Sequence, residues 1–179
     1  MNKPYYEMIA AGLVLFLAGS LMAQGVRMEL TSSAFHEGGS IPSRYTCDGK
    51  NISPSLRWSG APAGTKSFAL IADDPDAPAG AWAHWLLWNL PASVKELDKG
   101  LPASPQLAEG TFQGKNDFGR NGYGGPCPPS GTHHYVFKLY ALDTKLTLKS
   151  DASRPNVEAA MKDHILAQAS LIGVYQRKP

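Results

Sequence analysis

The chain has 179 residues, of which 43% are hydrophobic and 18% are charged, and its formal net charge is +2 at pH 7. This length suits one sizeable hydrophobic core and is short for two domains. The basic residues form no cluster interleaved with aromatic side chains, which argues against a nucleic-acid-binding protein.

The N-terminal residues have the pattern of a signal peptide. Lys3 precedes an apolar run at residues 9–23, which is shorter than the ~20 residues that cross a bilayer as a helix. We therefore predict a signal peptide at residues 1–23 and a single domain at residues 24–179, exported to the periplasm or secreted, with no transmembrane span once the leader is removed. Leu21 is larger than the residue preferred two positions before a cleavage site at Ala23, so an uncleaved N-terminal anchor is the alternative.

Six segments are predicted to be strands. Period-two alternation and short apolar runs between turn residues are typical of half-buried and buried strands. The segments are 27–32, 56–58, 67–73, 82–90, 134–142 and 170–175, and residues 91–118 between the fourth and fifth are expected to form a long excursion of turns.

One helix is predicted after the fifth strand. Ser153 can cap it, Pro155 lies near its first position and Glu158 lies in its first turn. The residues at helical spacing on its largely apolar face are Val157, Ala160, Met161, His164, Ile165 and Gln168. Many strands with one late helix predict a mainly β fold, an antiparallel sandwich with a few short helical pieces.

Cys47 and Cys127 are the two cysteines of the chain, and both follow the predicted leader. In an oxidising compartment such a pair is expected to form one disulfide, which the chain-entropy model credits with ~4 kcal/mol of stabilisation for a long loop. Two separate thiols are the alternative. It stays open because the sequence alone does not show whether the Cα atoms of Cys47 and Cys127 lie within bridging distance.

The acidic segment at residues 73–78 (DDPDAP) directly follows a predicted buried strand. Its prolines favour a rigid, extended turn whose carboxylates accept local hydrogen bonds. Calcium takes ~6–8 oxygen ligands from a flexible loop, and this turn offers too few, so we predict no metal site.

His84 lies inside the apolar run at 82–90, where strict alternation would place it on the face of Trp82, Leu86 and Trp88, opposite Trp85. A lone histidine in such a run is commonly a hydrogen-bonded core residue. It becomes a candidate ligand-binding residue if a carboxylate of the acidic segment meets it.

The segment 123–135 combines glycines and prolines with two histidines and a tyrosine. Glycines let the backbone approach a ligand closely, and successive N–H groups near Gly125 could form an anion-binding concavity. His133 and Tyr135 are two residues apart, so on a strand they point the same way and can supply an imidazole and a phenol to one pocket. A hairpin loop with surface histidines is the alternative.

Together and in this order, these motifs resemble those of the phosphatidylethanolamine-binding protein family, also called Raf kinase inhibitor-like proteins, in its bacterial and archaeal branch. The resemblance extends from about Met28 to Gln176 and is carried by residues 74–78 (DPDAP), 84–89 (HWLLWN), 123–126 (YGGP) and 133–135 (HHY). It implies an antiparallel Greek-key β-sandwich with a small surface cavity that accepts phosphate-like or carboxylate-like anions.

The resemblance also implies which residues form this cavity. They are Asp74, Asp76, His84, Gly125, His133 and Tyr135. A carboxylate can orient a histidine, and a histidine with backbone N–H groups can donate to an anion. Asp74 would repel a dianion, which favours a zwitterion such as phosphoethanolamine or a singly charged anion. A bridge between Cys47 and Cys127 would lock the loop beside the pocket.

We therefore expect a binding module for a small anionic or zwitterionic ligand, with modulation of a protein partner as a further expectation, and no cofactor or catalytic residue. An inhibitor of an exported protease or other enzyme is the first alternative, and residues 91–118 could supply its exposed segment. A hydrolase that uses Asp74, His84 and His133 is the second. The chain has no Gly-x-Ser-x-Gly, His-Glu-x-x-His or Walker motif, and a disulfide would remove Cys127 as a nucleophile.

Overall fold

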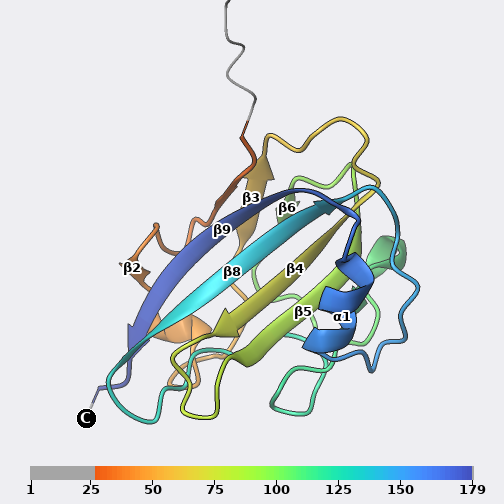
Figure 1. The fold of residues 1–179 in the computed structure, drawn as a ribbon. Helices are drawn as coiled ribbons and strands as arrows, with labels where there is room; N and C mark the ends of the chain where they lie inside the picture. The colour runs from red at the N-terminus through yellow and green to blue at the C-terminus, as the bar shows by residue number, and fades with distance from the viewer. Residues whose placement is uncertain (1–26, 179) are drawn as a thin grey trace, which may run out of the picture.

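Nine strands in two sheets form the framework of the computed structural model, which describes residues 27–178 (Figure 1). The smaller sheet has the order β1–β3–β6, formed by Glu29–Thr31, Leu56–Ser59 and Glu96–Leu97. The larger sheet has the order β2–β9–β8–β4–β5–β7, formed by Gly39–Ser40, Ile165–Gln176, Thr132–Leu142, Ser67–Asp74, Trp82–Pro91 and Phe112–Gln113. Paired strands are antiparallel except β2 and β9. The predicted mainly β fold is confirmed, and each predicted strand overlaps an observed one.

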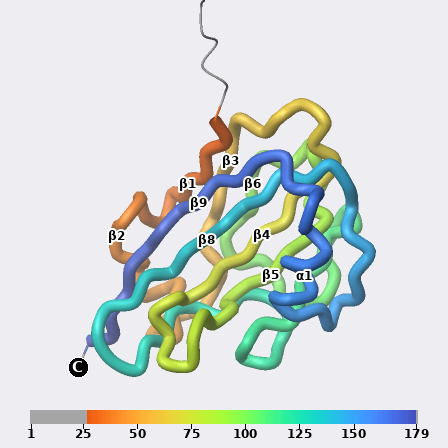
Figure 2. Tube along the Cα trace, in the orientation of Figure 1, coloured from red at the N-terminus to blue at the C-terminus, as the bar shows by residue number. Residues whose placement is uncertain are grey.

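The larger sheet is covered on both faces near β4. Phe68 and Leu70 lie in an inner core cluster shared with the smaller sheet, whereas Ala69 and Ile71 lie in an outer cluster with α1 (Arg154–Met161). Figures 1 and 2 show α1 over β4 and β5, with β3 and β6 behind the larger sheet. A strand buried on both faces needs apolar side chains in succession, which explains the unbroken apolar run of β4.

A β-bulge interrupts β5 at His84. In the ladder with β4, Ala83 lies opposite Asp73 and Trp85 lies opposite Ala72, so His84 is the extra residue. The bulge lets two consecutive side chains, those of His84 and Trp85, face the inner side of the sheet.

The face predicted for His84 is therefore wrong in part. Leu86 and Trp88 belong to the outer cluster, while the His84 ring lies against the inner-face residue Tyr135, with ring centroids 5.1 Å apart. Strict alternation along a strand holds only where no extra residue is inserted.

Helix α1 is shorter than its sequence pattern predicts. It begins directly after the predicted capping residue and ends at Met161, and Asp163 then adopts a left-handed conformation with φ of 68°. His164 lies in the turn that follows, and Ile165 and Gln168 belong to β9. The pairing of β9 with β8 along nearly its whole length outweighs the helical spacing of these side chains.

The predicted signal peptide at residues 1–23 and the start of the predicted domain at residue 24 lie outside the described residues. Within residues 27–178, no helix reaches the length and apolar character needed to cross a membrane.

Candidate functional site

Three of the predicted pocket residues meet at one end of the inner face of the larger sheet. Asp74 is the last residue of β4, and His133 and Tyr135 lie near the start of β8. As predicted, His133 and Tyr135 share one face of the strand, and both are buried. The preceding carboxylate, Asp73, points to the opposite face because side chains alternate along β4.

Asp73 fixes this end of the sheet from the helix side. Its carboxylate is 2% exposed and pairs with Lys138 of β8 and Arg154 of α1, each at 3.2 Å. The two consecutive aspartates therefore have separate environments: Asp73 joins α1 to the sheet, and Asp74 faces the inner side of the sheet.

Asp74 orients His133. The Nδ1–H of His133 donates to Asp74 Oδ2 at 2.7 Å, and both side chains are almost completely buried. The other carboxylate oxygen of Asp74 accepts the backbone N–H of Asp76 at 2.9 Å. Because a carboxylate only accepts, the proton of a neutral His133 lies on Nδ1, and Nε2 makes no hydrogen bond with any residue between 27 and 178.

Asp76, which the sequence placed in the pocket, lies on its exposed rim. Its Oδ2 accepts the backbone N–H of His134 at 2.8 Å and the Nδ1–H of His134 at 2.7 Å. These bonds hold the pKa of Asp76 below its usual value. The backbone N–H of Asp76 thus helps to hold the Asp74 carboxylate in place, while the Asp76 side chain bonds His134.

His84 is held by the backbone and not by a carboxylate. Its Nδ1–H donates to the carbonyl oxygen of Gly124 at 2.6 Å, which leaves Nε2 as a lone pair in the neutral ring. Burial lowers the pKa of His84, and the Gly124 carbonyl and the nearby Asp74, Asp117 and Asp73 only partly oppose that effect. No carboxylate of residues 73–78 hydrogen-bonds His84, because Asp74 bonds His133, Asp73 faces the other side of the sheet and Asp76 bonds His134.

Tyr135 carries a hydroxyl group that no described residue satisfies. The atom is buried and makes no hydrogen bond, although the Asp74 carboxylate and the Cys127 N–H lie near it. Burial, with the negative charge of Asp74, raises the pKa of this phenol, so the group stays protonated at physiological pH. A buried hydroxyl without a partner is costly, so this O–H group is the candidate donor of the site.

Gly125 acts through its size and not through a free N–H group. Its N–H donates to Asn51 Oδ1 at 2.7 Å, and the neighbouring Gly124 N–H donates to the His84 carbonyl at 2.9 Å. A Cβ at Gly125 would overlap the Tyr45 carbonyl oxygen. The expected concavity of free N–H groups near Gly125 is therefore occupied by the protein's own acceptors, and the glycine is needed for close packing.

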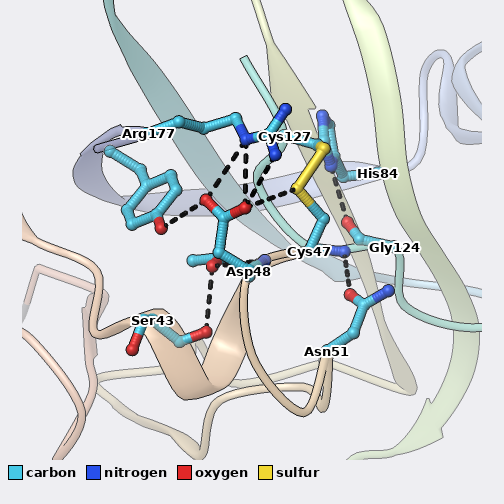
Figure 3. Close-up of a disulfide and its surroundings, with 11 residues drawn as sticks. Ser43, Cys47, Asp48, Asn51, His84, Gly124, Cys127 and Arg177 are labelled. Carbon is cyan, nitrogen blue, oxygen red and sulfur yellow. Dashed lines mark hydrogen bonds and ion pairs between the residues drawn. A yellow bond between two sulfur atoms is a disulfide. The ribbon is translucent and has the colours of Figure 1, made fainter. Parts of the chain in front are cut away.

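The predicted disulfide is present between Cys47 and Cys127, with Cα atoms 5.4 Å apart (Figure 3). The Cys47 N–H also donates to the Pro126 carbonyl at 3.0 Å. Next to the bridge, Asp48 accepts the Tyr175 hydroxyl at 2.8 Å and the Arg177 Nε–H at 3.0 Å. Figure 3 shows that the bridge joins the loop after η1 (Ser43–Tyr45) to the loop that holds His84.

Two aromatic residues at the site were not among the predicted pocket residues. Trp82 lies opposite Asp74 in the ladder, and its buried Nε1–H has no described partner. Phe118 packs edge-to-face against His84 and Trp82, with ring centroids 5.2 and 5.6 Å away. Trp82 could have been placed at the site from the sequence, because it lies two residues before His84 on the same predicted strand. No sequence motif indicates that Phe118 lies there.

The Tyr135 hydroxyl is shut off from solvent, because its oxygen atom is buried. The space beneath His84 and Tyr135 is bordered by Ala72, Tyr123, Pro126 and Phe137 and is too narrow for a water molecule. A ligand therefore reaches the Tyr135 hydroxyl only if a neighbouring side chain moves.

Comparison with known proteins shows the relationships of the chain. Residues 31–176 match the family model described as phosphatidylethanolamine-binding protein. A UPF0098 protein of Methanothermobacter thermautotrophicus is 53% identical over 150 residues, covering 84% of this chain and 99% of that protein. The crystal structure of Escherichia coli YbcL, described as a new member of the mammalian PEBP family, has a TM-score of 0.80 and 40% identity and covers 85% of this chain and 99% of its own. A PEBP homologue of Chlamydia trachomatis, CT736, has a TM-score of 0.79 and 40% identity and covers 86% and 99%.

Proposed function

The chain belongs to the phosphatidylethanolamine-binding protein family, and from this premise we propose that it binds a small anionic group, a phosphate or a carboxylate, beside Asp74, His133 and Tyr135. The observation that carries the proposal is the buried hydroxyl of Tyr135, which has no partner among the described residues. Such a group is rarely left unsatisfied in a folded protein, and an anion is the ligand that best accepts its hydrogen bond.

The surrounding groups define the chemistry of this ligand. Tyr135 donates its O–H. Because the Nδ1–H of His133 and of His84 is already engaged, Nε2 of either ring donates only when that ring carries a second proton. Asp74 keeps a negative charge close to the bound anion. We therefore expect a singly charged anion, or a zwitterion such as phosphoethanolamine, to bind more tightly than a dianion of similar size.

We also propose that the protein acts outside the cytoplasm. The predicted leader and the Cys47–Cys127 disulfide both support this location. N-terminal sequencing of the protein recovered from the periplasm or the medium tests the proposal. A first residue of Gln24 supports it, and a full-length chain retained in the cytoplasm would contradict it.

Replacement of Tyr135 by phenylalanine is expected to weaken binding of phosphoethanolamine by about tenfold or more, because a hydrogen bond to a charged group is lost. The free energy of unfolding should change by less than about 1 kcal/mol, because the hydroxyl has no partner to lose in the free protein. Isothermal titration with phosphate, phosphoethanolamine and acetate, together with urea unfolding, measures both quantities.

Tyr140→Phe is the matched control, because Tyr140 lies on the same strand but on the opposite face. It should leave binding unchanged. Equal binding by wild type and Tyr135→Phe would overturn the proposed role of the hydroxyl, and the absence of saturable binding by wild type would overturn the proposed function.

Sulfate should bind more tightly as the pH falls below about 6.5, by at most about tenfold per pH unit for one proton taken up. The pKa of His84 in the free protein is lower than its ordinary value of 6.5, and an anion near Nε2 raises it. Between these two pKa values the complex holds a proton that the free protein lacks. The affinity for sulfate therefore rises as the pH falls from the His84 pKa of the complex towards that of the free protein. Sulfate keeps its charge over this range, and titrations at several pH values measure the slope. A His84→Asn variant with an unchanged slope would rule out His84 as the source.

A further inference from the structure

Phe118 packs against two residues of the site that each carry a nitrogen atom without a hydrogen-bond partner among residues 27–178. Its ring lies against His84, whose Nε2 is uncommitted, and against Trp82, whose buried Nε1–H has no described partner. A Cβ on Gly124 would overlap the Phe118 ring, so the ring also rests directly on the backbone of the pocket loop. Phe118 is 42% exposed whereas His84 is 4% exposed, so the Phe118 ring lies on the solvent side of His84.

The backbone that carries Phe118 is fixed. Asn116 is buried, and its Oδ1 accepts the N–H groups of Phe118 at 3.1 Å and Arg120 at 3.2 Å. Its Nδ2–H donates to the Gly122 carbonyl at 2.9 Å. The segment is further closed by a β-bridge between Lys115 and Asn121. Movement of this segment as a whole would break these bonds.

The other walls of the pocket are also fixed. The loop that carries Pro126 is held by the disulfide, by the Asn51–Gly125 hydrogen bond and by the Tyr123 hydroxyl, which donates to the Tyr45 carbonyl at 2.9 Å. By contrast, the Phe118 side chain makes no hydrogen bond; within residues 27–178 it is held by packing against aromatic rings and the Gly124 backbone and by the Arg120 guanidinium, 5.7 Å from its ring centroid. Among these walls, the Phe118 side chain can move at the smallest cost, by a change of rotamer.

We propose that Phe118 is the gate of the anion pocket and that it determines which ligands the pocket admits. Rotation of its ring away from His84 and Trp82 uncovers these two residues, and the Tyr135 ring lies directly against His84, with ring centroids 5.1 Å apart. The inference rests on the proposed anion-binding function. Because the closed form must first open, the apparent affinity of wild type is reduced by the fraction of molecules in which the ring has moved.

Phe118→Ala should therefore bind phosphoethanolamine and inorganic phosphate about tenfold more tightly than wild type, with faster association, because the ring no longer has to be displaced. Titration calorimetry and stopped-flow tryptophan fluorescence measure the two effects. Leu166→Ala is the matched control, since Leu166 has the same 42% exposure and lies near the start of β9, and it should behave as wild type. The double variant Phe118→Ala/Tyr135→Phe should bind about tenfold more weakly than Phe118→Ala, which places the tighter binding at this pocket.

The outcomes separate the gate from the function. Binding by Phe118→Ala alone, or tighter binding than by wild type, supports the gate. Unchanged or weaker binding by Phe118→Ala, with saturable binding by wild type, overturns the gate and leaves the pocket in place. If neither protein binds phosphate or phosphoethanolamine, the pocket and its gate are both overturned.

Discussion

Replacement of both Cys47 and Cys127 by alanine is expected to lower the free energy of unfolding by about 4 kcal/mol. The bridge joins residues 80 positions apart, so its loss frees a large loop in the unfolded chain and increases the entropy of the unfolded state. Urea unfolding of the double variant and of wild type under oxidising conditions measures the difference.

The same variant should retain its anion affinity within about threefold, because the pocket loop keeps other attachments. These are the hydrogen bonds from the Cys47 N–H to the Pro126 carbonyl, from the Tyr123 hydroxyl to the Tyr45 carbonyl and from the Gly125 N–H to Asn51. Wild type treated with dithiothreitol is the control and should match the variant. A loss of stability below about 1 kcal/mol would show that the bridge adds little to the native fold.

His133→Ala is expected to destabilise the protein by about 3 kcal/mol, because it leaves the buried Asp74 carboxylate without its partner. The chain offers a matched control in the next residue. His134 forms the same type of bond with Asp76 at the same 2.7 Å, but both side chains are about half exposed. His134→Ala should therefore cost less than about 1 kcal/mol.

Urea unfolding of both variants makes the comparison, and it isolates the effect of burial from that of the hydrogen bond. Equal losses in His133→Ala and His134→Ala would contradict the distinction between a buried and a solvent-screened pair. His133→Asn keeps a donor for Asp74 and should recover part of the lost stability.

The strands could be predicted from the sequence, because each combines a typical length with period-two or continuous apolar character. The apolar run at 67–73 corresponds to β4, which is buried on both faces. The end of the helix could not be predicted, because Ile165 and Gln168 continue the helical spacing although they pair in β9. That pairing is a contact with β8, which is remote in sequence, and no local pattern reports it.

The sequence indicated most residues of the site, but not which of their side chains contact one another. Asp74, His133 and Tyr135 meet, but the bulge at His84 changes which side chains share its face, and a single sequence gives no sign of the bulge. Asp76 was expected in the pocket from the family resemblance, yet β4 ends at Asp74, and the Asp76 side chain bonds His134 on the exposed rim. Phe118 reaches the site through a loop whose path is set by the buried Asn116, a long-range arrangement with no local signature.

A crystal structure of the protein grown with saturating phosphoethanolamine tests the central claim most directly. We predict a phosphate oxygen within about 3 Å of the Tyr135 hydroxyl oxygen, with the Phe118 ring rotated away from His84. A pocket that stays closed and empty at saturation, or a ligand bound only elsewhere, would contradict an anion-binding role for this site.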